Sequence, residues 1–222
     1  MPRARLIGTL LATGLVTILG GMRDLGAAGV KLPDPAVDDT PGAPAGTTTV
    51  VLAGGCFWGI EEVFQHVRGV TDAVSGYSGG SARTARYEMV STGTSGHAES
   101  VKVTYDRSKI TLGQILKIFF SVALDPTQLN RQGPDVGPQY RSAIFYANER
   151  QQQLAKSYLD QLSAARAFHA PIVTQVVPLQ AFYDAEPEHQ DFAARNPSHR
   201  YIAIIDKPKI DDLKREFPSL YK

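Results

Sequence analysis

The 222-residue chain has a single cysteine, Cys56, and a single tryptophan, Trp58. One cysteine excludes a disulfide within the chain and the paired cysteines of a structural zinc site. The charge is almost balanced, because 23 lysines and arginines face 22 aspartates and glutamates. This balance excludes a broad basic surface for nucleic acid. The five histidines are scattered along the chain, so we expect no bound metal.

Long apolar runs are confined to the N-terminus. Arg3 and Arg5 precede an apolar stretch over residues 6–22, and the small residues 26–28 are typical of a cleavage site. This order predicts a signal peptide over residues 1–28 and an exported, periplasmic protein. An uncleaved membrane anchor is the alternative. Without residues 1–28, which carry three arginines and one aspartate, the formal charge moves from +1 to −1. No apolar run long enough to span a membrane remains.

Residues 29–46 contain several prolines and no apolar periodicity, which predicts a flexible linker. Residues 47–222 have room for one hydrophobic core and show no internal repeats. We therefore expect a single domain over residues 47–222, and we expect it to be a monomer.

The stretch around Cys56 predicts a sharp turn from a strand into a helix. Residues 47–53 are rich in β-branched side chains, two glycines follow, and apolar residues then recur at helical spacing over residues 57–64. Cys56 is thus expected at a helix N-terminus, where the dipole favours a thiolate. A lone thiol in an oxidising compartment is a liability unless it is used, which favours a reactive Cys56 over a buried apolar one.

The rest of the domain alternates strand-like and helix-like segments. The long polar segment 125–142 is expected to lack regular structure and to be functional. Together the pattern predicts an α+β domain, a mixed β-sheet flanked by helices. Strands are expected over residues 69–78, 100–105, 143–147 and 171–177, and helices over residues 112–120, 149–167 and 207–221.

Two polar positions allow different interpretations. Glu99 begins the strand over residues 100–105, where a carboxylate is usually solvated or paired. His97 stands two residues before it, but the scattered histidines disfavour a metal site. A cysteine hydrolase would use Cys56 with His97 or His189 as its base.

Five motifs, in order and with similar spacing, resemble the methionine sulfoxide reductase A family, the peptide-methionine (S)-S-oxide reductases. They lie between about Val50 and Pro197. They are Gly-Cys-Phe-Trp-Gly at residues 55–59, Gly-Tyr-Ser-Gly-Gly at 76–80, Tyr-Glu-Met-Val at 87–90, Gly-His-Ala-Glu at 96–99, and the polar run 130–142.

The resemblance implies a two-layer, ferredoxin-like sandwich and thiol-dependent reduction of methionine-S-sulfoxide, free or in oxidised exported proteins. Cys56 matches the cysteine that attacks the sulfoxide sulfur and becomes a sulfenic acid, and Glu99 matches the acid. This overturns the solvated interpretation of Glu99. Tyr87 and Tyr140 match the tyrosines that hydrogen-bond the sulfoxide oxygen, Asp135 matches a residue that orients substrate or water, and Phe57 and Trp58 match the pocket for the S-methyl group.

The chain departs from the family pattern at two places. Leu124 stands where members often have histidine, which we interpret as loop variation outside the reacting centre. No cysteine follows Cys56, so an outside thiol must resolve the sulfenic acid. The implied partner is a small thiol or a thioredoxin- or glutaredoxin-like protein, with no bound cofactor. The remaining alternative is a non-catalytic domain that binds oxidised methionine through Phe57 and Trp58.

Overall fold

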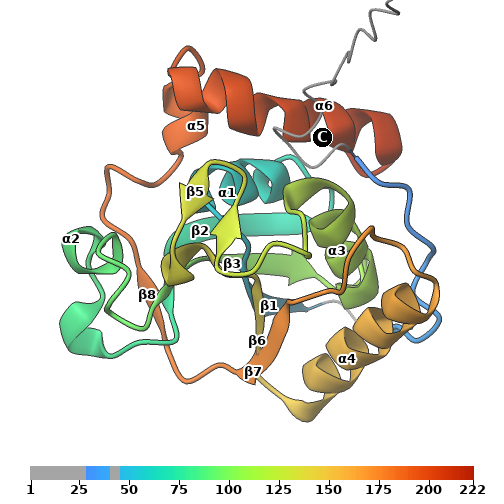
Figure 1. Cartoon of the computed structure of the whole chain (residues 1–222). Helices are drawn as coiled ribbons and strands as arrows, with labels where there is room; N and C mark the ends of the chain where they lie inside the picture. The colour runs from blue at the N-terminus through green and yellow to red at the C-terminus, as the bar shows by residue number, and fades with distance from the viewer. Residues whose placement is uncertain (1–28, 41–45) are drawn as a thin grey trace, which may run out of the picture.

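A six-stranded sheet forms the centre of the computed structural model, which describes residues 29–40 and 46–222 (Figure 1). The signal peptide predicted over residues 1–28 lies outside the described residues. The strand order is β7-β6-β1-β3-β2-β8, with β6 and β7 parallel and the other neighbours antiparallel, which confirms the mixed sheet. The strands are β1 (Thr47–Ala53), β2 (Val70–Ser78), β3 (Ala98–Asp106), β6 (Ala143–Tyr146), β7 (Gln175–Pro178) and β8 (Phe182–Asp184).

The longer helices contribute side chains to one large core cluster against the sheet. Within the two described ranges, no helix is long and apolar enough to cross a membrane. The helices are α1 (Phe57–Gln65), α2 (Tyr87–Val90), α3 (Leu112–Ile118), α4 (Glu149–Ala164), α5 (Phe192–Arg195) and α6 (Lys207–Glu216), with short 3₁₀ or π turns over Ala82–Thr84, Phe119–Ala123, Pro138–Tyr140 and Ile202–Asp206.

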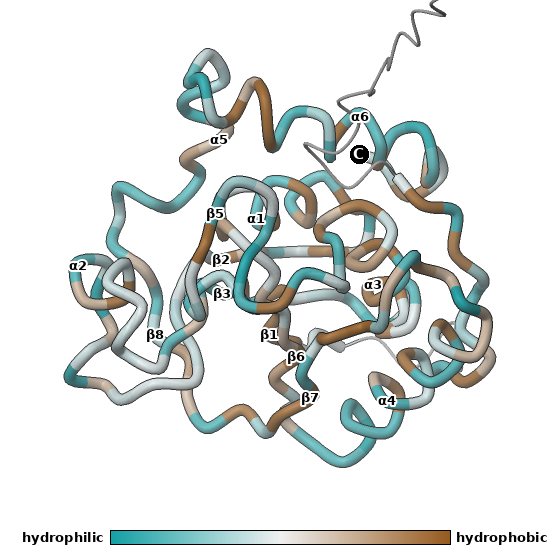
Figure 2. The backbone as a smooth tube through the Cα atoms, viewed as in Figure 1, coloured by the Kyte–Doolittle hydropathy of each residue, from teal (hydrophilic) through white to brown (hydrophobic). Residues whose placement is uncertain are grey.

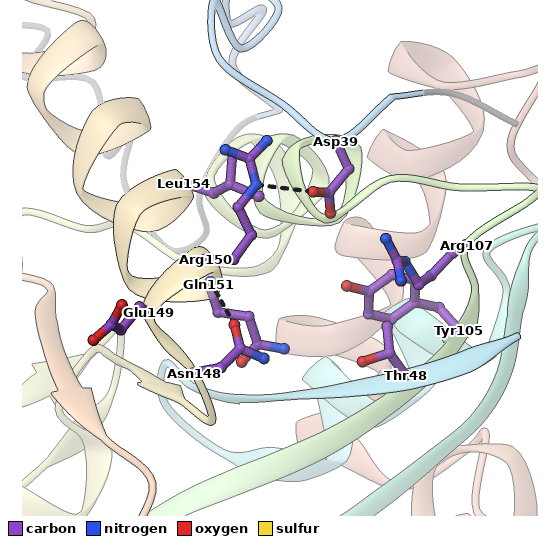
Figure 3. Close-up of a pocket in the computed structure, with 9 residues that line it drawn as sticks. All are labelled: Asp39, Thr48, Tyr105, Arg107, Asn148, Glu149, Arg150, Gln151 and Leu154. Carbon is purple, nitrogen blue, oxygen red and sulfur yellow. Dashed lines mark hydrogen bonds and ion pairs between the residues drawn. The ribbon is translucent and has the colours of Figure 1, made fainter. Parts of the chain in front are cut away.

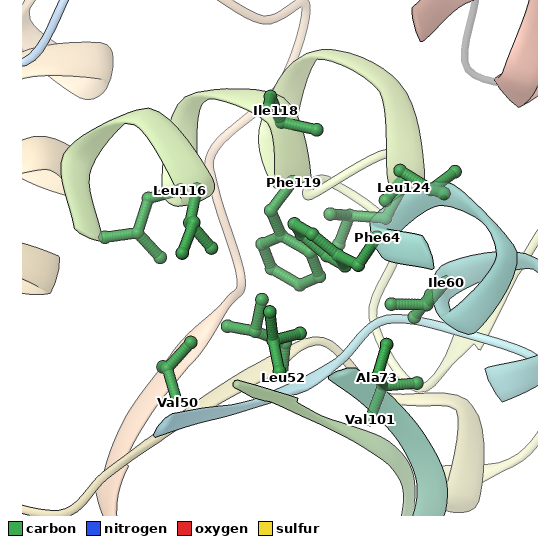
Figure 4. Close-up of a cluster of buried hydrophobic side chains, with 14 of the residues drawn as sticks. Val50, Leu52, Ile60, Phe64, Ala73, Val101, Leu116, Ile118, Phe119 and Leu124 are labelled. Atoms are coloured by element: carbon green, nitrogen blue, oxygen red, sulfur yellow. The ribbon is translucent and has the colours of Figure 1, made fainter. Parts of the chain in front are cut away.

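The central strand β1 is buried on both faces, as its β-branched composition predicts. Val50 and Leu52 join the large cluster, in which they face side chains of α1 and α3 (Figure 4). Val51 and Ala53 point to the other face and join a smaller cluster. In Figure 2, β1 is mainly hydrophobic and α4 mainly hydrophilic, in keeping with a central strand and a surface helix. The buried strand therefore holds the Cys56 turn at its end.

The segment over residues 125–142 is more ordered than its composition predicts. It contains a short hairpin of β4 (Arg131–Gln132) and β5 (Asp135–Val136), joined through Gly133, whose φ is +55°. The Asp125 carboxylate accepts the backbone N–H of Thr127, and the Gln128 side chain accepts the N–H of Gly133. The prediction that this segment lacks regular structure is therefore wrong, because its own polar groups tie it together.

Residues 29–40 lie against the domain, which differs from the flexible linker expected over residues 29–46. Figure 1 shows this blue segment running from α6 past α3 to α4. Leu32 is buried in the main core, and the Tyr158 hydroxyl donates to the Pro33 carbonyl at 2.9 Å. The carboxylate of Asp38 accepts the backbone N–H of Gly113 in the first turn of α3 at 2.8 Å. These contacts hold residues 29–40 in place, although their proline-rich composition predicts a flexible linker.

We predict that Leu32→Ala lowers the free energy of unfolding by about 2–4 kcal/mol, because it removes a core side chain and leaves a cavity. Val37 lies on the same segment and is 42% exposed. Val37→Ala is therefore the matched control, and its effect should stay below about 0.5 kcal/mol. Urea denaturation monitored by Trp58 fluorescence measures both. Equal, small losses for the two variants would mean that residues 29–40 do not stabilise the domain.

Candidate active site

The turn between β1 and α1 places Cys56 at the N-cap of α1, as predicted. Gly55 has φ +101°, a conformation that strongly favours glycine. A Cβ atom at Gly55 would also lie 2.7 Å from the side chain of Gln132. Gln132 in turn is fixed by hydrogen bonds to the backbone N–H and carbonyl of Asp125. The glycine thus lets the polar segment close directly over the cysteine turn.

Glu99 is brought to the same turn from the start of β3. Its side chain is 2% exposed, and its Oε2 accepts the backbone N–H of Phe57 at 3.1 Å. Burial raises the pKa of Glu99 to about 8, although the Phe57 N–H bond lowers it and the charge of Asp135 adds to the rise. The carboxyl is therefore mostly protonated at neutral pH. The expectation of a solvated Glu99, based on its strand position alone, is wrong.

Cys56 does not have the thiolate character that its helix position predicts. Burial raises the pKa of the thiol well above its ordinary value, and Glu99 and Asp206 raise it further when they are ionised. A hydrogen bond from the Trp58 backbone N–H lowers the pKa, but this effect is smaller. The prediction from the helix dipole is thus wrong in sign, because desolvation outweighs the dipole at this buried position. In the free protein Cys56 is a thiol.

Tyr87 and Tyr140 approach the same site from separate elements, the start of α2 and the end of the 3₁₀ turn at Pro138–Tyr140. Burial raises the pKa of both hydroxyls, and the charges of Glu99, Cys56 and Asp135 raise them further. Two phenols that remain protonated can donate hydrogen bonds to an oxygen atom held beside Glu99.

The β4–β5 hairpin carries Asp135 into the cluster. Its Oδ2 accepts a hydrogen bond from the hydroxyl of Tyr201. Burial raises the pKa of Asp135, and this Tyr201 bond lowers it. Asp135 is therefore part of a polar network at the site, which its place in a turn-forming sequence does not indicate.

The two aromatic residues after Cys56 differ in exposure. Phe57 is fully buried, with its ring beside those of Tyr77 and His189. Trp58 is partly exposed and stacks on Phe192, with ring centroids 3.8 Å apart. Its indole N–H donates to Nδ1 of His189 at 3.3 Å. These contacts fix the Trp58 ring, so that it offers a rigid apolar surface beside the cysteine.

Neither histidine considered as a base for Cys56 is arranged for that role. His97 accepts the backbone N–H of Gly80 at Nδ1, and its Nε2 lies 3.0 Å from the Ser81 carbonyl, so it holds a loop together. The Nδ1 of His189 is occupied by Trp58. In the described part of the chain no histidine hydrogen-bonds the cysteine. The cysteine-hydrolase hypothesis therefore loses the contact that it requires.

Sequence reasoning missed contacts that support this site from outside the five motifs. Glu186 accepts the Tyr77 hydroxyl at 2.8 Å and the backbone N–H of Tyr87 at 2.9 Å, which fixes the start of α2. Leu124, expected outside the reacting centre, is buried beneath the turn, 3.1 Å from a Cβ built at Gly54. No local motif marks these contacts, because their partners lie many residues away in the sequence.

A separate pocket opens at the opposite end of β1 from Cys56 (Figure 3). It contains an ion pair between Arg150 and Asp39, 3.1 Å apart. None of the predicted site residues lines this pocket. Across the described ranges, no group of three or more histidine, cysteine, aspartate or glutamate residues has an arrangement suited to a metal ion. The groups gathered at the candidate active site are a thiol, a carboxylic acid and two phenols.

Comparisons with known proteins agree with this arrangement. Residues 48–220 match the family model described as "Peptide methionine sulfoxide reductase". "Peptide methionine sulfoxide reductase MsrA 2" of Mesorhizobium japonicum is 56% identical over 183 residues, which are 82% of this chain and 93% of the relative. The protein of the same name from Synechocystis sp. is 49% identical over 86% of this chain and 90% of its own.

Solved structures extend the similarity to the fold. Methionine sulfoxide reductase A of Corynebacterium diphtheriae has a TM-score of 0.60 and 36% identity, and the match covers 71% of this chain and 78% of the other. Reduced Mxr1 from Saccharomyces cerevisiae has a TM-score of 0.62 and 30% identity, over 71% of this chain and 92% of the other. The chain belongs to the peptide methionine sulfoxide reductase family, as a member of its MsrA group.

Proposed function

We propose that this enzyme reduces methionine-S-sulfoxide through a sulfenic acid on Cys56. The sulfur of Cys56 attacks the sulfoxide sulfur, the oxygen passes to the cysteine, and methionine leaves. The cysteine loses two electrons and the sulfoxide gains them, so a thiol and a sulfoxide give a sulfenic acid and a thioether. The observation that carries this proposal is the joining of Glu99 to the Cys56 turn through the backbone N–H of Phe57.

Glu99 acts as the general acid in this proposal. A sulfoxide sulfur becomes a better electrophile when its oxygen receives a proton, and the acid must therefore hold a proton before the reaction. A buried carboxyl whose pKa is about 8 meets this requirement at neutral pH. As the oxygen takes the proton from Glu99, the Cys56 thiol gives its own proton to the Glu99 carboxylate, so no net charge accumulates at the site.

Tyr87 and Tyr140 orient the sulfoxide oxygen, and Trp58 receives the S-methyl group. The tyrosine hydroxyls stay protonated and can donate to the oxygen, while the fixed indole provides a soft apolar surface for the methyl. Asp135, bonded to Tyr201, orients the substrate or a water molecule. Phe57 supports this surface from the core.

An outside thiol completes the cycle, because the sequence holds no second cysteine. The thiol attacks the Cys56 sulfenic acid, water leaves, and a mixed disulfide forms. A second thiol then releases the Cys56 thiol and takes away the disulfide. Thiol dependence is general for the family, and we propose a small thiol or a thioredoxin- or glutaredoxin-like protein as the reductant.

We further propose that the protein is exported to the periplasm, is monomeric, and repairs oxidised exported proteins there. The support for export is the order of residues 1–28 and the surroundings of Gly29. The backbone nitrogen of Gly29 donates to the Asp212 carboxylate at 2.7 Å, and Arg215 also bonds that carboxylate. Cleavage before Gly29 would create an ammonium group at this nitrogen, next to a carboxylate that can pair with it.

The nucleophile is tested by a single turnover with racemic methionine sulfoxide and no added reductant. We expect loss of the S epimer alone, one methionine per enzyme and one thiol consumed at Cys56. Cys56→Ser should form no methionine above background, because a serine hydroxyl cannot accept the sulfoxide oxygen as the cysteine sulfur does when it becomes a sulfenic acid. Binding of the sulfoxide without turnover in the native protein would instead support the non-catalytic binding domain.

The acid is tested by the pH dependence of the same single turnover. The rate should fall as the pH rises above about 8, where Glu99 loses its proton. Glu99→Gln should slow the step about a hundredfold, because the amide cannot supply the proton, and should abolish this alkaline fall. Stopped-flow measurement of sulfenic acid formation gives both results. An unchanged rate in Glu99→Gln would exclude Glu99 as the acid.

Export is tested by expression of the complete chain in a Gram-negative host with fractionation and intact-mass measurement. The periplasmic protein should begin near Gly29. Material that retains Met1 in the membrane fraction would indicate an uncleaved anchor, and intact protein in the cytosol would contradict export.

A further inference from the structure

A buried ion pair at the start of α6 has no place in the reaction as described. Asp206 and Lys209 are joined at 3.1 Å, and their side chains are 0% and 8% exposed. Burying two charges is costly, and a buried ion pair is therefore weak evidence of stabilisation. The same helix also carries an exposed pair, Lys207 and Asp211, at 3.2 Å. The position of the buried pair, rather than the pairing itself, needs an explanation.

The buried pair fills the space left by the missing side chain of Gly59. A Cβ atom at Gly59 would lie 2.0 Å from Oδ1 of Asp206 and 2.9 Å from Nζ of Lys209. Gly59 stands three residues after Cys56, so it lies on the same side of the first turn of α1. Gly59 thus leaves room for the Asp206 carboxylate and the Lys209 ammonium group one helical turn from Cys56.

Charged groups from several elements face this region. The Asp206 charge acts on Cys56 in the same direction as those of Glu99 and Asp135. In the portion of the chain that the structure describes, Oδ2 of Asp206 is buried without a hydrogen-bond partner. The other titratable groups that face Cys56 are the hydroxyls of Tyr87, Tyr140 and Tyr201. The titratable groups that face Asp206 are Lys209, Glu62 of α1, Asp135 and Tyr201.

We propose that Asp206, paired with Lys209 in the gap at Gly59, is a positioning residue that keeps the lone Cys56 protonated between turnovers. Burial raises the pKa of Asp206, and the charge and hydrogen bond of Lys209 act against this rise and favour the carboxylate. A carboxylate there disfavours a second negative charge on the nearby sulfur. A protonated thiol reacts slowly with oxidants, and the chain has no second cysteine to capture a sulfenic acid that forms without substrate. The protective value of this device rests on Cys56 being the nucleophile proposed above.

The direct test is the rate of Cys56 alkylation by iodoacetamide against pH, in the absence of sulfoxide. Alkylation requires the thiolate, so Asp206→Asn should move the profile to lower pH and raise the rate at neutral pH by at least about threefold. Asp211→Asn removes the same charge from the exposed pair on the same helix and should leave the profile unchanged. A profile of folded Asp206→Asn that superimposes on that of the native protein would overturn the proposal.

A second variant covers the case in which Asp206→Asn does not fold because Lys209 is left buried alone. Asp206→Asn combined with Lys209→Met removes both charges at similar volume, and its alkylation profile should move in the same direction. Circular dichroism checks that each variant is folded. A folded double variant with the native profile would also contradict the proposal.

Hydrogen peroxide supplies an independent readout of the same charge. The thiolate sulfur attacks one peroxide oxygen, the O–O bond breaks, and the released hydroxide takes a proton to become water. Without sulfoxide, Asp206→Asn should form the Cys56 sulfenic acid faster than the native protein by a factor similar to that for alkylation. Turnover by Cys56→Ser would refute the proposed mechanism and leave the alkylation result standing, so the two proposals fail separately.

Discussion

The hydrogen bond from the Phe57 N–H to Glu99 is the contact on which the site depends. It joins the first residue of α1 to the start of β3 and gives a donor to a carboxyl that is almost fully buried. Because Cys56 directly precedes Phe57, the same bond sets the Glu99 carboxyl beside the Cys56 turn. The left-handed conformation of Gly55, the closure of Gln132 over it and the Asp206–Lys209 pair at Gly59 all surround this one connection.

Burial leaves the Cys56 thiol and the Glu99 carboxyl largely uncharged in the free protein. Desolvation holds the thiol of Cys56 and the carboxyl of Glu99 in their protonated forms near neutral pH, and a negative charge on Glu99 would disfavour a second one on Cys56. In the proposed reaction, transfer of the Glu99 proton to the sulfoxide oxygen makes the sulfoxide sulfur electrophilic, and the Cys56 thiol gives up its proton as it attacks. The resting state and the reaction thus follow from the same desolvation.

Local sequence patterns predicted the β1 strand, the N-cap position of Cys56 and the start of α1, because these depend on β-branched residues, glycines and helical spacing. The local patterns gave wrong predictions where the structure depends on contacts between residues far apart in the sequence. The ionisation of Cys56 depends on carboxylates from β3 and from the turn before α6, and the order of residues 29–40 depends on partners in α3 and α4. Site residues such as Glu99 and Asp135 came from the resemblance to a family, since their own positions indicated a solvated carboxylate and a turn.

The protonation of Glu99 is the central claim, and infrared spectroscopy measures it directly. Difference spectra between the native protein and Glu99→Gln, recorded from pH 5 to 10, isolate the C=O stretch of this one carboxylic acid. The account predicts that the band is present at neutral pH and disappears with a midpoint near 8. If the band is already absent at pH 6, Glu99 is ionised in the resting protein, and it cannot be the proton donor of the reaction.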